Sequence, residues 1–179
     1  MYLSDKTIKK LVKSIGLIEP YDKKYLNPCS YDLTLGDLFL KERGQGCRLR
    51  TIKPENPTAV EYEEMDRSVE QITIKPNEFV LATTRETISL PTNLAAQIHG
   101  KSSLGRLGLS IQNAGHIDPG FSGKVTLELH NESKSVICLD NTVRICQIIF
   151  IPTDKPVEKP YHGKYVGQND VTAARKEKD

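Results

Sequence analysis

The chain has 179 residues, of which 37% are hydrophobic, and its formal net charge is +2. This length suits one domain with a sizeable core, and the small net charge excludes a general electrostatic affinity for nucleic acid. The wholly apolar runs are only a few residues long and no signal peptide pattern opens the chain. We therefore expect neither a membrane helix nor export, and we expect a cytoplasmic location.

One amphipathic helix is predicted near the N-terminus, from Asp5 to Ser14. Ser4 stands where it could cap the first turn, and Gly16 stands where the helix would end. The apolar residues that share one face of this helix are Ile8, Leu11, Val12 and Ile15. The lysines on the other face indicate a solvated surface rather than a binding patch.

From Tyr31 onward the sequence is typical of strands and turns. Alternating apolar and β-branched runs predict strands over Glu78–Thr84, Glu86–Leu90, Leu94–Ile98, Lys124–Asn131, Ser135–Leu139 and Val143–Ile151. Between residues 42 and 76 the sequence is mostly polar, and Gln71–Lys75 is the best strand candidate there. Many short strands in a single domain favour a jelly-roll sandwich or a β-barrel. We predict a mainly β fold with one short N-terminal helix.

The last predicted strand carries one polar residue on an otherwise apolar face. The residues of that face are Val143, Ile145, Gln147, Ile149 and Ile151. A core-facing amide requires hydrogen-bond partners. Gln147 is therefore either satisfied inside the core or in contact with a ligand, and the residues by themselves leave both interpretations open.

A short polar segment follows Gly100 and has the residue types that bind anions. It consists of Lys101, Ser102, Ser103, Leu104, Gly105 and Arg106. Its two cations and two hydroxyls stand beside backbone amides that the nearby glycine leaves accessible. This combination is typical of a cradle for phosphate oxygens.

After the 101–106 segment the sequence predicts a tight turn and then a strand that carries one carboxylate. Asp118-Pro119-Gly120 is a strong turn signal, and the strand Lys124–Asn131 follows it. Val125, Leu127 and Leu129 fall on one face of this strand, and Lys124, Thr126, Glu128 and His130 fall on the other. Glu128 consequently faces either solvent or a site that needs a carboxylate.

These segments resemble the dCTP deaminases, which are members of the trimeric dUTPase superfamily. The resemblance is carried by Gly100–Asn131, by Asn27–Gly36 near the N-terminus, and by Gln147 with its apolar neighbours. In the last part of the chain it is carried by Tyr161, Lys164, Tyr165 and Gln168. The resemblance implies a distorted dUTPase-like jelly roll or barrel, a homotrimer with sites between subunits, and dCTP as substrate.

The resemblance also implies roles for individual residues. Glu128 would move the protons during hydrolysis of the cytosine amine, a task that one carboxylate can perform in sequence. Arg106, Ser102, Ser103 and Gln147 would bind the triphosphate together with the other residues of the 101–106 segment. Arg106 and Ser102 also count as catalytic, because Arg106 would favour the ionised form of Glu128 and Ser102 could position water. Asp118, Thr126 and Leu127 would hold sugar and base. Mg²⁺ would be bound through phosphate oxygens, without a protein cage. dUTP and dTTP are further expected ligands.

Two types of enzyme fit this resemblance, one releasing dUTP and one continuing to dUMP and pyrophosphate. Asp118 permits the second step without demonstrating it. Ala114-Gly115 favours the type that forms dUMP, which we take as the prediction. Three features depart from that type: Asn113 replaces a usual Thr, His116 replaces an apolar or aromatic residue, and the loop after Gly108 is one residue shorter. A deaminase that stops at dUTP is the alternative.

The C-terminal residues 161–179 are polar and contain little to bury, which by composition indicates a frayed tail. The resemblance implies a closing segment in which Tyr161, Lys164 and Gln168 contact sugar and phosphates. We predict one domain over residues 1–179 that includes this segment.

A zinc deaminase and a non-catalytic binding module are two further interpretations of the sequence. His130-Asn131-Glu132 matches half of the zinc signature, but no cysteine pair with zinc-ligand spacing accompanies it, because Cys29, Cys47, Cys138 and Cys146 are scattered. We therefore expect no zinc and no disulfide framework. A jelly-roll module that only binds a nucleotide or a protein would release no ammonia from dCTP.

Overall fold

The computed structural model describes residues 1–43, 62–65, 71–112, 115–140 and 143–175. Its helical elements are α1 (Asp5–Ile15), a 3-10 turn η1 (Lys23–Tyr25) and α2 (Ser102–Gly105). The first strands are β1 (Ile18–Glu19), β2 (Tyr31–Thr34), β3 (Leu40–Glu42), β4 (Tyr62–Glu64), β5 (Gln71–Ile74) and β6 (Phe79–Ser89). The later strands are β7 (Leu94–Gly100), β8 (Leu109–Gln112), β9 (His116–Ile117), β10 (Ser122–Asn131), β11 (Ile137–Asp140) and β12 (Arg144–Pro152).

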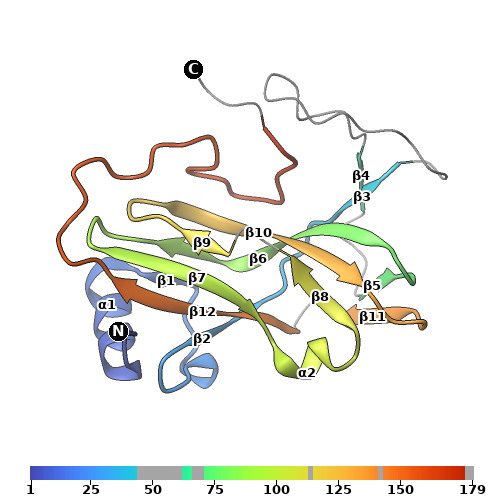
Figure 1. Cartoon of the computed structure of the whole chain (residues 1–179), viewed down its shortest axis with the longest axis horizontal. Helices are drawn as coiled ribbons and strands as arrows, with labels where there is room; N and C mark the ends of the chain where they lie inside the picture. The colour runs from blue at the N-terminus through green and yellow to red at the C-terminus, as the bar shows by residue number, and fades with distance from the viewer. Residues whose placement is uncertain (44–61, 66–70, 113–114, 141–142, 176–179) are drawn as a thin grey trace.

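Among the described residues the strands form three antiparallel sheets. The largest has the order β4-β3-β6-β10-β8, with β1 also paired to β6. The second has the order β2-β12-β7-β9, and β11 pairs with β5 in a small third sheet. The first two sheets form the body of the molecule in Figure 1. The predicted mainly β fold with a short N-terminal helix is confirmed, although the described strands do not join into one closed barrel.

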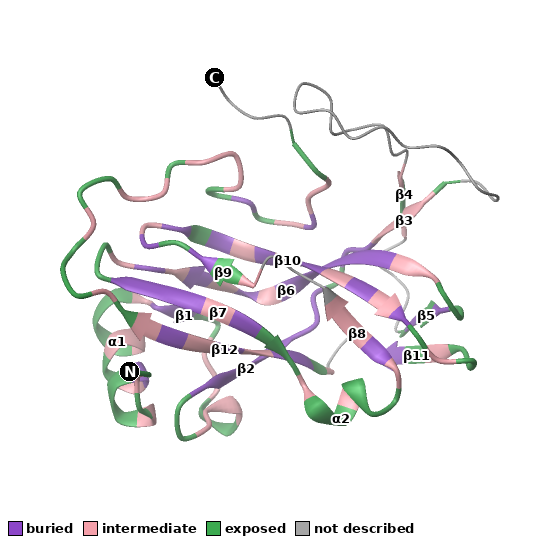
Figure 2. Cartoon of the chain, viewed as in Figure 1, coloured by how far each residue is buried: buried purple, intermediate pink, exposed green. Residues whose placement is uncertain are grey.

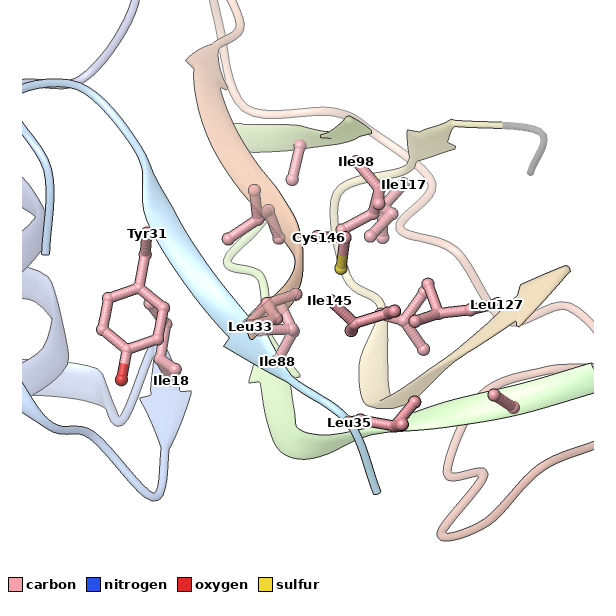
Figure 3. Close-up of a cluster of buried hydrophobic side chains, with 14 of the residues drawn as sticks. Ile18, Tyr31, Leu33, Leu35, Ile88, Ile98, Ile117, Leu127, Ile145 and Cys146 are labelled. Atoms are coloured by element: carbon pink, nitrogen blue, oxygen red, sulfur yellow. The ribbon is translucent and has the colours of Figure 1, made fainter. Parts of the chain in front are cut away.

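The core lies between these two sheets. Leu127 and Ile88 come from the first sheet, and Leu33 and Cys146 come from the second, and none of these four is exposed to solvent. Figure 3 shows their side chains converging on the same interior. Along β10 buried and partly exposed residues alternate, as predicted, and Figure 2 shows this as alternating colours. This alternation buries Leu127 and Leu129 and leaves Glu128 on the opposite face.

One strand replaces two predicted strands, Glu78–Thr84 and Glu86–Leu90. The chain continues without a turn through Arg85 as β6, because a bulge lies there in the pairing with β10, between Lys124 and Thr126. The Thr84 hydroxyl accepts the Val125 N–H at 3.0 Å and donates to the Glu86 carbonyl at 2.8 Å. These bonds satisfy backbone groups that a regular ladder would have paired.

The predicted face of the last strand was wrong. The pairing of β12 with β2 shifts between Arg144 and Cys146, so that Ile145 and Cys146 are both buried. This bulge reverses the alternation after Cys146, and Ile148 and Phe150 continue the core face. Gln147 is consequently only half-buried on the outer face and is not a core amide.

Helix α1 agrees with its predicted bounds to within one residue. Gly16 ends it in the left-handed conformation, with φ of 64°, and its N–H donates to the Val12 carbonyl. Ser4 precedes the helix but makes no side-chain cap, and Ile15 is 45% exposed instead of buried. Ile8 is the fully buried contact of the helix with the core. No helix among the described residues is long and apolar enough to cross a membrane.

The chain after β12 is held against the body of the molecule up to residue 175. Thr153 N–H donates to the Asn93 carbonyl and Tyr161 N–H to the Pro119 carbonyl. Beyond these anchors the segment passes over β9 and β10, where it is drawn in red in Figure 1. Composition alone indicated a frayed tail for residues 161–179. In the described part of this segment Gly167 N–H donates to the Ser122 carbonyl and Thr172 N–H to Thr126 Oγ1, which contradicts that interpretation.

Candidate active site

A cavity of about 510 Å³ is bounded by β9, β10 and the C-terminal segment, with a further wall from β6. Its polar wall residues include His116, Asp118, Thr126, Glu128, Gln168 and Thr172. Its apolar wall residues include Tyr62, Phe79, Leu81, Ile98, Phe121 and Val125. The volume and the few polar groups among apolar walls are typical of small-molecule sites.

Glu128 is placed in this cavity by the strand register. On β10 it lies opposite Leu81 of β6 and Gln112 of β8. Its Oε2 atom is fully buried and has no hydrogen-bond partner among the described residues. Of the two orientations that the sequence left open, the structure therefore has the one toward a site.

The electrostatic state of Glu128 follows from this burial. Removal from water disfavours the carboxylate and raises the pKa of Glu128 from 4.5 to about 7, against a smaller lowering by a backbone hydrogen bond. A carboxyl with a pKa near neutrality exchanges protons readily in both directions at physiological pH. Glu128 thus has the property required of a group that first accepts and then donates a proton.

Asp118 lies on the turn between β9 and β10 and reaches the cavity rim. Its Oδ1 atom is 3.1 Å from Nε2 of His116, and the two side chains are 57% and 53% exposed. Tyr161 of the C-terminal segment is fixed to this turn through the Pro119 carbonyl. The turn that carries Asp118 and the C-terminal segment therefore lie together at the cavity.

The C-terminal segment closes the cavity through backbone pairing with the start of β10. Gly167 N–H donates to the Ser122 carbonyl at 2.7 Å, and Lys124 N–H donates to the Gln168 carbonyl at 2.9 Å. The Gln168 Nε2 atom also donates to the Lys124 carbonyl at 2.6 Å. Gln168 is only 8% exposed, and its amide nitrogen is already used by the protein.

Residues 101–106, which were predicted to bind phosphate, do not reach this cavity. Ser102, Ser103 and Arg106 are exposed on and just after α2, and none of the residues 101–106 lines the cavity wall. Figure 1 shows α2 at the far end of the molecule from the C-terminal segment. Within one copy of the chain, the triphosphate ligands predicted at residues 101–106 therefore do not lie in the same cavity as Glu128.

Lys101 has a partner that the sequence did not suggest. Its Nζ atom lies 2.6 Å from the carboxylate of Asp32, which is buried, and Nη1 of Arg144 contacts the same oxygen at 3.2 Å. A paired ammonium is a weaker phosphate ligand than a free one. The alternating pattern around Asp32 gave no sign that this residue would be buried and would need cations.

The other predicted ligands are distributed as follows. Leu104 packs partly against the core, Leu127 is fully buried in it, and Gly105 is exposed with open space where a Cβ would lie. Gln147 and Lys164 do not line the cavity, and Lys164 stacks on the Tyr165 ring at 5.5 Å. Gly115 does line it, with φ of 69°. Ala114 lies outside the described residues.

Sequence reasoning missed several wall residues. Thr172 donates its N–H to Thr126 Oγ1 at 3.2 Å, and Tyr62, Phe79 and Leu81 form the apolar wall near Glu128. Their apolar character was visible in the sequence, but strand pairing decides which of them face the cavity. No group of three or more His, Cys, Asp or Glu residues in the described part of the chain could hold a metal ion.

Comparison with known proteins relates this chain to a family. The family profile described as dCTP deaminase-like matches residues 2–153. The protein named "dCTP deaminase, dUMP-forming" from Persephonella marina is 41% identical, over 98% of this chain and 97% of its own. The protein of the same name from a Sulfurihydrogenibium species is 43% identical with the same coverage.

A solved structure has the same fold. The 2'-deoxycytidine 5'-triphosphate deaminase from Agrobacterium tumefaciens superposes with a TM-score of 0.66 at 23% identity. The match covers 83% of this chain and 47% of that longer chain. The family profile and the relatives above show that the chain belongs to the dCTP deaminase-like family.

Proposed function

We propose that the protein hydrolyses dCTP to dUMP, pyrophosphate and ammonia, and so supplies a pyrimidine deoxynucleotide. The observation that carries the proposal is the half-buried Glu128, whose pKa is raised to about 7 in the wall of a cavity of nucleotide size. The names of the relatives, which specify formation of dUMP, support the same conclusion. A cytoplasmic location belongs to the proposal.

In the deamination step Glu128 takes a proton from a water molecule as the oxygen of that water bonds to the ring carbon bearing the amine. The carboxyl then gives this proton to the ring nitrogen. It next takes the remaining proton of the added hydroxyl and gives it to the amine, so that a carbonyl forms, the carbon–nitrogen bond breaks and ammonia leaves. The apolar walls around Leu81 and Phe79 keep the pKa of Glu128 high enough for this return.

The second step cleaves the triphosphate. Asp118, at the rim of the same cavity, would hold the deoxyribose hydroxyl and orient the water that attacks the α-phosphate. The bond between the α-phosphorus and its bridging oxygen breaks, and pyrophosphate leaves. The water proton passes to the Asp118 carboxylate and then to solvent.

The triphosphate needs cations, and no Lys or Arg among the residues that the structure describes lines this cavity. We propose that a second copy in a homotrimer supplies Ser102, Ser103 and Arg106, with Lys101 and Gln147 near them. Arg106 has the planar donors that bind phosphate oxygens, and its exposed position leaves it free to reach a neighbouring subunit. The complete site would then lie between subunits, under the C-terminal segment 161–179 of one chain.

Mg²⁺ is part of the proposal as a ligand of the substrate. The cavity wall carries two carboxylates among the described residues, Asp118 and Glu128, which are too few for an octahedral protein cage. These residues fit an ion that is bound mainly by phosphate oxygens and water. Bound there, the ion would neutralise charge on the triphosphate. dUTP and dTTP would occupy the same cavity.

A product assay tests the proposal. Purified protein with dCTP and Mg²⁺ should release ammonia, pyrophosphate and dUMP in equal amounts. Glu128→Gln should lower ammonia release by about 10²- to 10⁴-fold, whereas Glu132→Gln, a neutralisation of an exposed carboxylate nearby, should leave it unchanged. dUTP as the sole product would identify the simpler deaminase, and no ammonia at all would indicate a binding module.

A further inference from the structure

His116 contacts Asp118, and the chemistry above gives this contact no role. The two residues flank Ile117, which is 8% exposed and whose backbone pairs with Ala96 of β7. Because side chains alternate along an extended segment, burial of Ile117 places His116 and Asp118 on the same side. Both line the cavity, and Nε2 of His116 lies 3.1 Å from Oδ1 of Asp118.

The direction of this hydrogen bond is fixed by chemistry. A carboxylate oxygen can only accept, so Nε2 of His116 carries the hydrogen and donates it. No other side chain among the described residues hydrogen-bonds the carboxylate of Asp118. The second oxygen, Oδ2, is therefore left for a ligand or a water molecule, while the first is held by the imidazole.

We propose that His116 is a positioning residue that orients the Asp118 carboxylate for phosphate cleavage. The inference rests on the proposed function, because it assigns His116 to the second step alone. An exposed carboxylate turns freely about its last torsion, and a bond to one oxygen limits that rotation. Correct orientation of a group that holds the attacking water accelerates the chemical step without strengthening substrate binding.

The competing explanation is an ion pair with no role in the reaction. Surface pairs with half-exposed side chains contribute little to stability, so substitution of His116 should leave the fold intact. Because the fold would stay intact, any change in the kinetics of a His116 variant can be assigned to the reaction and not to unfolding. If the pair has no role in the reaction, its loss would change neither kcat nor KM for pyrophosphate release.

The test uses dUTP, which separates phosphate cleavage from deamination. His116→Phe should lower kcat for pyrophosphate release about tenfold with KM changed less than about twofold, as expected for loss of one charge-assisted hydrogen bond in the transition state. His116→Gln, whose amide N–H can reach Oδ1, should restore most of kcat. With dCTP, His116→Phe should raise the proportion of dUTP among the products.

A double-mutant cycle shows whether His116 acts through Asp118. Asp118→Asn should nearly abolish pyrophosphate release, and adding His116→Phe should cause no further loss. A full tenfold further loss, an unchanged kcat in His116→Phe, or an effect on KM alone would overturn the inference. If the wild-type protein releases no pyrophosphate from dUTP, the proposed dUMP-forming function fails instead, and the two failures are thereby distinguished.

Discussion

At the scale of single residues, the buried Glu86 and the half-buried Glu128 have different surroundings. Glu86 is 2% exposed, and both of its carboxylate oxygens accept hydrogen bonds from Thr34, at 2.7 and 2.9 Å. Glu128 has a buried oxygen without any such partner in the described structure and faces a cavity. A satisfied buried carboxylate is a structural element, whereas an unsatisfied one at a cavity is available for a ligand.

The raised pKa of Glu128 predicts a measurable cost in stability. The folded chain releases this proton near pH 7 and the unfolded chain near pH 4.5, so stability present below pH 4.5 is lost as pH rises through 7. Glu128→Gln removes this dependence. Because the side chain is only half-buried, we expect a modest effect, with the variant melting about 2–4 °C above wild type at about pH 8.5 and equally at about pH 4.

Thermal melts of both proteins across this pH range provide the measurement. Glu132→Gln serves as the matched control, since Glu132 is 56% exposed and should show no such trend. A Glu128→Gln protein that melts below wild type at high pH would mean that the carboxylate is stabilised by contacts instead of being desolvated.

At the scale of elements, two bulges decide where side chains point. The regular alternation of β10 made the orientation of Glu128 relative to Leu127 and Leu129 predictable from sequence. Extra residues interrupt the ladder, two in β6 and one in β12. The first bulge lies where two strands were predicted instead of one, and the second turns Gln147 outward. A bulge depends on hydrogen bonds with a partner strand, and so periodicity within one strand does not reveal it.

The C-terminal segment depends on a glycine for its place on β10. Gly123 has φ of 152°, and a Cβ there would lie 2.9 Å from the carbonyl oxygen of Gln168. Gly123→Ala should therefore displace the segment while the two main sheets remain folded. We expect trypsin to cleave after Lys164 several-fold faster, KM for the nucleotide to rise about tenfold, and the melting temperature to change by less than about 3 °C.

Gly100→Ala is the control for this experiment, because a Cβ at Gly100 would meet no atom within 4 Å. Equal rates of tryptic cleavage in both variants and wild type would show that the segment does not depend on this contact. Global unfolding would appear instead as a large fall in melting temperature, which separates the two effects.

At the scale of the whole molecule, the arrangement of α2 and the cavity has a consequence for oligomers. If one copy supplies Glu128 and another supplies Arg106, two inactive variants can complement each other. Glu128→Gln and Arg106→Ala, each inactive alone, should regain about a quarter of wild-type activity when mixed equally after reversible dissociation, because one in four randomly formed sites has both native residues.

Co-refolded or co-expressed protein assayed for ammonia release checks this expectation. The control mixes wild type equally with a chain that carries both Glu128→Gln and Arg106→Ala. Sites between subunits then leave about a quarter of full activity, whereas sites within one chain leave about half. Activity below about one percent in the mixture of single variants, despite subunit exchange, would place Glu128 and Arg106 in the same chain's site.

The sequence by itself determined the strand-rich fold, the placement of Glu128 on the face of β10 opposite Leu127 and Leu129, and the residue types for proton transfer and anion binding. These features depend on local alternation, turn residues and side-chain chemistry, which are all set by residues close together in the sequence. Only the tertiary structure decided which groups meet: Lys101 pairs with Asp32, Gln168 bonds to the Lys124 carbonyl, and residues 101–106 do not line the cavity that contains Glu128. Such contacts join residues far apart in the chain, and their geometry depends on sheet pairing and on bulges that no single strand encodes.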